Sequence, residues 1–354
     1  MNKLRLLFFI GCFSFHAFAQ NNSWTNSQHY VVEDTCKYTY SMILEDLNYF
    51  SSNFPEWVHP VEVGKSEFGL DLATVRIGYE KPKKDAVFLV GNIHAREDYS
   101  SKLVMKFLNI FLLNISNQDT IYPKAKSFLD SVDVYVMPVA NPDGLKIAHL
   151  DFKGIEDSFN LYKDKILVLE TFEEWKANGK GIDLNSSFDD GNHPVKKAKN
   201  AQSVLCSEGY KGEYPAQAKE TQLLQNFIHK IKPLVTVSFH TKGNVVYWAD
   251  EESHDHFCDI DTKINKTICG VSGFQFSNVS QSASNYGCGY ENYIRIRHGL
   301  LASCVELDEA KYGRKQSPDN EFNIRVWSKA WQIPYSYIES AILYKNDLLK
   351  INDF

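Results

Sequence analysis

Two histidines and one glutamate have the types and positions that a catalytic metal requires. His94 and Glu97 are three residues apart and directly follow the apolar run 86–90. A pair with this spacing in a turn can direct an imidazole and a carboxylate to one point, and Zn²⁺ accepts this ligand set. Catalytic zinc needs a third protein ligand and an open position for water. His240, which follows the apolar run 234–239, is the best candidate for that ligand.

A second glutamate has the properties of a proton acceptor. Zinc lowers the pKa of a bound water, and a carboxylate that is not a ligand is then needed to take the proton. Glu306 ends an apolar run that starts at Leu300. A glutamate is unusual in a core strand, so we expect Glu306 to be either paired or catalytic.

The pattern His-x-x-Glu is not specific by itself, because it occurs twice, at His94 and at His59. Only His94 follows a buried-strand pattern, whereas His59 lies in a segment flanked by Pro60. The remaining histidines are interpreted as surface or satisfied core residues. Among them are His29, His149, His193, His229 and the pair His254 and His256 in an acidic loop.

Three continuous apolar runs predict strands that are buried on both faces. Each run precedes polar residues of the candidate site, and the runs span residues 86–90, 132–137 and 234–239. Helical patterns lie between them, at 101–114 and 216–231. This alternation predicts an α/β layered sheet, in which sites form beyond the carboxyl ends of the strands.

The first 19 residues have the pattern of a secretory signal peptide: a basic start, an apolar run and Ala-Phe-Ala before Gln20. We expect a secreted or periplasmic protein with no membrane anchor after cleavage. The mature chain, 20–354, is then a single domain with an amphipathic helix at 38–54. Cleavage changes the formal net charge from −6 to −8. An acidic chain without a basic tract is poorly suited to nucleic acid. Six cysteines remain, which permits disulfides, although buried free thiols fit equally well.

The order of the motifs resembles the zinc metallocarboxypeptidase family. These motifs are GNIHARE (91–97), NPDG (141–144), GIDLN (181–185), SFHTKG (238–243) and the late strand with Glu306. Further segments resemble the bacterial branch that includes γ-D-glutamyl-meso-diaminopimelate peptidases, namely the YTY helix, WKAN (175–178), EYPAQAKET (213–221) and GYENY (289–293). The resemblance spans residues 36–340. It implies a carboxypeptidase-like domain with a mixed, mostly parallel twisted sheet and helices on both faces.

The resemblance also implies a role for each matched residue. Zinc would be held by His94, Glu97 and His240, with Glu306 as general base and later proton donor. Asn185 would help to bind the carboxylate of the substrate. Tyr286, or alternatively Tyr290, would close over the substrate, and Lys176, or alternatively Lys180, would stabilise the oxyanion. Arg96 would orient a ligand or the substrate, with a surface ion pair as the alternative.

One departure from the family pattern concerns Asn185. Digestive carboxypeptidases have an arginine after this asparagine, which clamps the terminal carboxylate, whereas this chain has Ser186 and Ser187. Serine cannot replace that bidentate fork. The peptidoglycan-directed branch also lacks the arginine, so the loss favours that branch.

These observations favour an exported zinc peptidase that cleaves a peptide bond near the end of a small peptide. The branch resemblance suggests a cell-wall muropeptide as substrate, and the bond between D-glutamate and diaminopimelate as the target. The alternatives are a general C-terminal carboxypeptidase, a zinc deacylase, and a catalytically silent binding protein on the same fold.

Overall fold

The computed structural model describes residues 37–83, 85–116, 122, 124–197, 203–257, 259–278, 287–309, 311, 313–314 and 317–352. The expected signal peptide, 1–19, lies outside these residues, as does Tyr286. Cys36 and Cys258 also lie outside them, whereas Cys206, Cys269, Cys288 and Cys304 are free thiols. All described residues belong to one compact unit, Val31–Phe354.

Eight strands form one sheet with the order β1-β2-β4-β3-β5-β8-β6-β7. Four adjacent strands in its centre, β4, β3, β5 and β8, run parallel. Strands β6 and β7 are also parallel to each other. The pairs β1/β2, β2/β4 and β6/β8 are antiparallel. The strands are β1 (Val58–Val61), β2 (Thr74–Ile77), β3 (Ala86–Val90), β4 (Asp133–Met137), β5 (Val235–Thr241), β6 (Val245–Tyr247), β7 (Gln275–Phe276) and β8 (Leu301–Leu307). The expected mixed, mostly parallel sheet is therefore confirmed.

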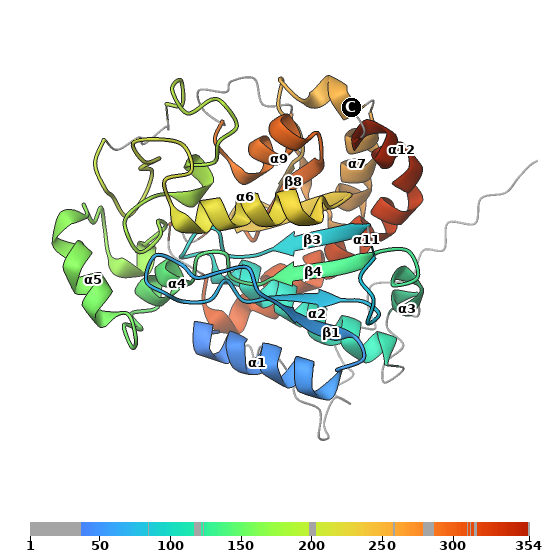
Figure 1. Ribbon diagram of the computed structural model, residues 1–354, viewed down its shortest axis with the longest axis horizontal. Coiled ribbons are helices and arrows are strands. Elements are labelled where there is room, and N and C mark those ends of the chain that lie inside the picture. The colour runs from blue at the N-terminus through green and yellow to red at the C-terminus, as the bar shows by residue number, and fades with distance from the viewer. Residues whose placement is uncertain are drawn as a thin grey trace, which may run out of the picture. The chain divides into compact units, whose positions relative to one another are not determined.

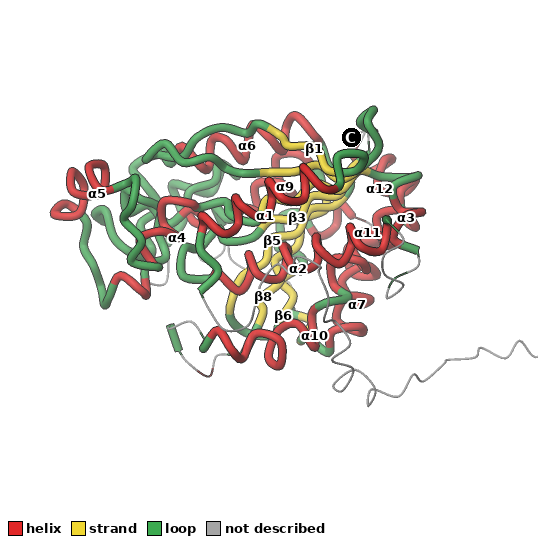
Figure 2. Tube along the Cα trace, turned by 90° about the horizontal axis from the view of Figure 1, so that it is seen from below, coloured by secondary structure: helices red, strands yellow, loops and turns green. Residues whose placement is uncertain are grey.

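The central strands are apolar because both of their faces are covered. In β3, Val87 and Leu89 belong to one apolar core, whereas Phe88 and Val90 belong to another. Successive side chains of a strand point to opposite faces, so one continuous apolar run serves both cores. The strands lie side by side in one twisted band (Figure 2).

Helices cover both faces of the sheet, as expected for an α/β layered fold. The first face is covered by α1 (Tyr40–Asn53), α2 (Asp98–Ile115), α7 (Ile260–Ser272), α11 (Ile333–Leu343) and α12 (Lys345–Asn352). The second face is covered by α6 (Lys219–Ile231) and α9 (Tyr290–His298). Figure 1 shows α6 and α1 on opposite sides of the strands. Shorter helices are α3 (Ala125–Phe128), α4 (Pro142–Ala148), α5 (Glu156–Tyr162) and α10 (Ser328–Ala330).

Helix α2 begins directly after the His94–Glu97 turn, three residues earlier than the apolar pattern predicts. Glu97 is its N-cap residue, and Asp98 lies in its first turn. An acidic first turn suits the positive end of the helix dipole. The turn that holds the candidate ligands is thus fixed between β3 and a long buried helix. Among the described helices, none is long and apolar enough to cross a membrane.

Candidate metal centre and active site

The structure brings the three expected metal ligands together at the carboxyl ends of β3 and β5. His94 Nδ1 lies 3.0 Å from Glu97 Oε1. His240 Nδ1 lies 3.0 Å from both His94 Nδ1 and Glu97 Oε2. The Glu97 carboxylate also accepts a hydrogen bond from the backbone N–H of Thr241 at 3.1 Å. All three side chains are buried, so their positions are set by the sheet and not by solvent.

This arrangement fits a tetrahedral zinc ion. Bonds of about 2.0–2.1 Å in tetrahedral geometry place neighbouring ligand atoms roughly 3.3 Å apart, close to the separations in the cluster. Two imidazole nitrogens that face each other at this distance need either a proton or a metal ion between them, and zinc would satisfy both lone pairs. Burial alone would lower the pKa of His94, but Glu97 beside it raises that pKa to about 9. Zinc bound there would act as a Lewis acid and would lower the pKa of a water ligand.

Asp183 orients one of the ligands from outside the cluster. Its Oδ1 atom lies 3.4 Å from His94 Nε2, and its Oδ2 atom lies 3.4 Å from Lys176 Nζ. The backbone N–H of Gly209 donates to the same carboxylate at 3.2 Å. Burial alone would raise the pKa of Asp183, but Lys176 and His94 hold that pKa well below its usual value. A carboxylate behind a histidine ligand fixes the ring orientation and its tautomer.

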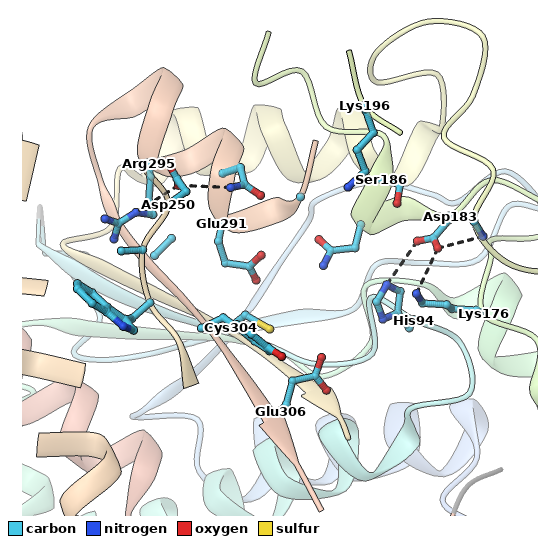
Figure 3. A pocket seen from close by; sticks show the side chains of 18 of the residues that line it. His94, Lys176, Asp183, Ser186, Lys196, Asp250, Glu291, Arg295, Cys304 and Glu306 are labelled. Carbon is cyan, nitrogen blue, oxygen red and sulfur yellow. Dashed lines mark hydrogen bonds and ion pairs between the residues drawn. The ribbon is translucent and has the colours of Figure 1, made fainter. Parts of the chain in front are cut away.

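Glu306 lies beside the cluster because of strand register. In the parallel pair β5/β8, Glu306 is the partner of His240. Its Oε2 atom is buried and has no hydrogen-bond partner within the described part of the chain. Burial and the neighbouring Glu97 raise the pKa of Glu306 to about 8. Glu306 lines the cavity next to the cluster, so it can exchange a proton with a molecule bound there (Figure 3).

Lys176 and Lys180, the two candidates for oxyanion stabilisation, lie in different places. Lys176 lines the cavity beside Asp183 (Figure 3). Lys180 is ion-paired with Glu67 at 2.7 Å and is not among the residues that line the cavity. The geometry therefore favours Lys176 for this predicted role.

The structure locates Asn185 and Tyr290, two of the residues predicted to contact the substrate. Asn185 lines the cavity, and its Oδ1 atom accepts a hydrogen bond from the backbone of Tyr290 at 2.7 Å, so its amide N–H groups are its remaining donors. The hydroxyl of Tyr290 is buried against Thr236, which excludes Tyr290 as the residue that closes over a substrate. Tyr286 remains a prediction.

Arg96 is engaged by a neighbouring acid. Its Nη1 and Nη2 atoms donate to the two oxygens of Glu208 at 3.1 and 3.3 Å, and Nη1 also donates to the carbonyl of Glu174. Glu208 lines the cavity, whereas Arg96 is not among its lining residues. Arg96 therefore forms an ion pair, as in the alternative interpretation, but the pair is largely buried and not at the surface.

The cavity beside the metal ligands has a volume of about 350 Å³. Its wall includes charged and polar residues that the sequence did not single out, namely Asp183, Lys196, Glu208, Asp250, Glu291, Arg295 and Cys304. Glu291 accepts a hydrogen bond from the hydroxyl of Ser238. Glu291, Cys304 and His240 each offer one possible metal-ligand atom, and these three atoms lie within 4.8 Å of one another. Only the GYENY motif gave a signal for Glu291, and it assigned no role.

Two long segments between the strands, residues 150–173 and 250–257, differ in their relation to the cavity. No described residue between 150 and 173 lines it, and α5 in this segment lies at the left edge of Figure 1. Asp250, at the start of the second segment, does line it. The second His-x-x-Glu pattern is structural, because His59 in β1 is hydrogen-bonded to the carbonyl of Gly78 at 3.1 Å.

A metal site with an adjacent buried carboxylate, at the carboxyl edge of a mixed sheet, defines a zinc-dependent hydrolase. The chain belongs to the zinc carboxypeptidase family, Peptidase_M14, which matches residues 43–312. The family resemblance noted in the sequence is thereby confirmed, and with it the use of zinc.

Individual relatives point in two directions. A γ-D-glutamyl-L-diamino acid endopeptidase of Lysinibacillus sphaericus is 26% identical over 81% of this chain and 68% of the relative. A carboxypeptidase B of Astacus astacus is 31% identical over 79% of this chain and 89% of the relative. Among solved structures, thrombin-activatable fibrinolysis inhibitor shares the fold, with a TM-score of 0.66 and 19% identity over 86% of this chain and 74% of that one.

Proposed function

We propose that this metallopeptidase is exported and hydrolyses the bond between D-glutamate and a diamino acid in peptidoglycan stem peptides. The N-terminal leader pattern supports export. The activity for which the Lysinibacillus relative is named supports the substrate. The observation that carries the proposal is the acidic side chain of Glu291 in the wall of the catalytic cavity.

Glu291 suits a substrate that has an amino group beyond the bond to be cleaved. It lies in the first turn of α9 and is directed into the cavity near His240 (Figure 3). A carboxylate in such a partly buried place attracts an ammonium group, because opposite charges interact more strongly there than in water. A diamino acid retains a free amino group on its side chain after it has formed the peptide bond.

The residues of the cavity divide the chemical work of hydrolysis. Glu306 accepts the proton of the attacking water and later donates it to the leaving nitrogen. Lys176 places a positive charge beside the reacting carbonyl, where negative charge develops in the transition state. Asp183 holds both Lys176 and His94 in position. The zinc ion supplies Lewis acidity.

A second candidate function is supported by the same acidic side chain. A carboxypeptidase that removes a C-terminal lysine or arginine would also use a carboxylate in this place, and the Astacus relative is a carboxypeptidase B. A catalytically silent binding protein is disfavoured, because the chain belongs to a peptidase family and the structure holds the complete set of ligands together with Glu306.

The experiment compares two substrates with the zinc-loaded mature protein. One is the tripeptide L-Ala-γ-D-Glu-meso-diaminopimelate, and the other is a peptide of ordinary α-linkage that ends in lysine. The proposal predicts release of diaminopimelate and little release of lysine, with Glu306→Gln as the inactive control. Efficient release of lysine beside an intact tripeptide would refute the proposal and support the second candidate.

Export is tested separately. Expression of the full chain in a bacterium should yield a processed protein outside the cytoplasm whose N-terminal residue is Gln20. A full-length cytoplasmic product would contradict this part of the proposal.

A further inference from the structure

Lys196 is a buried cation in the wall of the catalytic cavity. Only 8% of its surface is exposed, and it lines the same cavity as Asn185 and Ser186. Figure 3 shows its side chain directed toward Ser186, on the wall above the metal ligands. An ammonium group in this wall can reach a ligand in the cavity, and partial burial strengthens its attraction to a negative charge.

The backbone around Lys196 is fixed, so the side chain is presented from a rigid base. The N–H groups of Val195 and Lys196 donate to the carbonyl of Asn192 at 3.0 and 2.9 Å. The carbonyl of Lys196 accepts a hydrogen bond from Lys211 Nζ at 3.1 Å. A backbone that is held in this way loses little conformational freedom when a ligand binds to the side chain, and this favours affinity.

Groups of both signs of charge surround Lys196. Burial lowers the pKa of Lys196. The charge of Lys176 adds to that effect, whereas Cys288, Asp183 and Asp190 oppose it. A ligand carboxylate at this wall would stabilise the ammonium form and offset part of the cost of burying it.

Lys196 also lies close to the position where this chain lacks the arginine that follows the asparagine in digestive carboxypeptidases. The residue after Asn185 is Ser186, whose short neutral side chain cannot bind a carboxylate as an arginine does. Lys196 brings a positive charge to Ser186 from a different loop (Figure 3). The hydroxyl of Ser186 and the amide of Asn185 add uncharged donors to the same wall.

We propose that Lys196 binds a free carboxylate on the amino acid that the reaction releases, in place of an arginine at position 186. The contact is a charge-assisted hydrogen bond to a single ammonium group, so it selects for negative charge more than for geometry. The proposal applies to any peptide with a free carboxylate on that residue. It therefore does not depend on cleavage of a γ-D-glutamyl bond.

The test measures discrimination between charge states of the substrate. The tripeptide and the lysine-terminated peptide are each prepared as the free acid and as the carboxamide of the released residue. Cleavage is compared for the wild-type protein, Lys196→Met, Lys196→Arg and the matched control Lys197→Met, since Lys197 is adjacent but exposed. Calorimetric binding of the same pairs to Glu306→Gln, with and without Lys196→Met, gives a readout that does not require turnover.

The wild-type protein and Lys197→Met should prefer the acid to the amide by roughly ten- to a hundredfold, in kcat/KM and in affinity. Lys196→Met should lose that preference with little change toward the amide, whereas Lys196→Arg should retain part of it. Equal losses toward acid and amide in a folded, zinc-containing Lys196→Met protein would overturn the proposal. An unchanged preference in that variant would do the same. The choice between the two peptides tests the proposed function, and the acid-to-amide ratio tests Lys196, so the two can fail independently.

Discussion

At the scale of single residues, Glu306 shows how burial and charge prepare a proton acceptor. Its side chain is partly buried in the wall of the cavity, and burial together with the nearby Glu97 raises its pKa to about 8. A bound divalent cation acts in the opposite direction, because positive charge lowers the pKa of a neighbouring carboxyl. The residue can therefore take up a proton and release it again near neutral pH, as hydrolysis requires.

We expect Glu306→Gln to lower kcat by about 10²–10⁴-fold, because the amide cannot accept or return the proton. Zinc content and thermal stability should stay close to those of the wild-type protein, since Glu306 is not a ligand. Steady-state kinetics and metal analysis check both statements.

Glu309→Gln is the matched control, because Glu309 is exposed and lies three residues further along the chain. It should retain full activity. If the Glu306 variant hydrolyses the substrate at the wild-type rate, the assignment of the base is wrong.

The site residues that could be predicted from the sequence are those that lie next to a recognisable strand pattern. His94, Glu97, His240 and Glu306 each follow or end an apolar strand, and that context separated His94 from His59. Asp183 and Lys196 gave no comparable signal, because their roles depend on contacts between loops that lie far apart in the chain. Arg96 was ambiguous for the same reason, since Glu208, its partner, is 112 residues away.

At the scale of elements, the NPDG turn fixes the segment that holds Lys176. Asn141 caps α4 by accepting a hydrogen bond from the backbone of Gly144 at 3.0 Å. Asn141 also donates to the carbonyls of Ile93 and Ala177 at 3.1 and 3.0 Å. The turn thus joins the metal-ligand loop to the segment that contains Lys176.

Gly144 has no room for a side chain. A Cβ atom there would lie 2.4 Å from the carbonyl oxygen of Ala177 and 2.7 Å from the Cβ of Ala95. We expect Gly144→Ala to cost about 1–3 kcal/mol of unfolding free energy and to lower activity, because the segments next to Lys176 and His94 must move.

Gly270 offers a control for that variant. It lies within α7, and a Cβ atom there would meet nothing within 4 Å. Gly270→Ala should stabilise the protein by about 0.5–1 kcal/mol, because alanine favours the helix. Denaturant unfolding measures both changes, and equal effects of the two substitutions would contradict the steric argument.

Two buried carboxyl groups connect the same turn to α6. Burial raises the pKa of Glu220 to about 8 and that of Asp143 to about 6. Glu220 accepts hydrogen bonds from Asn178 Nδ2 at 2.9 Å and from the backbone of Glu67 at 3.1 Å, and Asp143 accepts one from Ser66. Two carboxyl groups in one enclosed site hold a proton between them, since both cannot ionise at low cost.

This pair makes stability depend on pH. The folded protein keeps the proton of Glu220 up to a pH of about 8, whereas the unfolded chain releases it near the ordinary value of 4.5. The folded state therefore binds more protons across this window, and its stability falls as the pH rises. In Glu220→Gln, which cannot ionise, the decline in unfolding free energy across the window should shrink by on the order of 3 kcal/mol.

Unfolding measured at a series of pH values tests this expectation. The variant should also lose about 1 kcal/mol at acid pH, because its amide nitrogen cannot accept the hydrogen bond from Asn178. Glu45→Gln, on the exposed side of α1, should leave the slope unchanged. If the unfolding free energy of Glu220→Gln falls with pH as steeply as that of the wild-type protein, the carboxyl pair does not hold the proton.

At the scale of the whole molecule, the metal ligands join elements that are distant in the sequence. His94 and Glu97 lie between β3 and α2, whereas His240 lies in β5. An ion that binds these three side chains binds only the folded chain with full affinity. Metal binding therefore adds to global stability.

We expect removal of zinc by a chelator to lower the thermal midpoint by roughly 5–10 °C, from a loss of about 4 kcal/mol when free zinc exceeds its dissociation constant a thousandfold. Calorimetric scans with and without chelator measure the shift. His240→Ala, which lacks one ligand, should show little difference between the two conditions. A midpoint that stays constant while metal analysis confirms loss of zinc would contradict the expectation.

The architecture was largely predictable, because the apolar runs are long and regular. The central strands β3, β4 and β5 occupy nearly the expected positions, and helices cover both faces as expected. Boundaries were less predictable: β5 continues through His240 to Thr241, and α6 begins three residues later than its pattern. Strand order could not be derived from the apolar pattern, because the runs do not specify which neighbours pair.

The pairing of His240 with Glu306 has a consequence for how such an enzyme can diversify. Adjacent strands are spaced by their backbone hydrogen bonds at about 4.8 Å, whatever side chains surround them. The backbone therefore sets the distance between the imidazole of His240 and the carboxylate of Glu306. Lys196 and Glu291 lie outside those two strands, so new specificities can arise by exchanging them while the reaction distance stays constant.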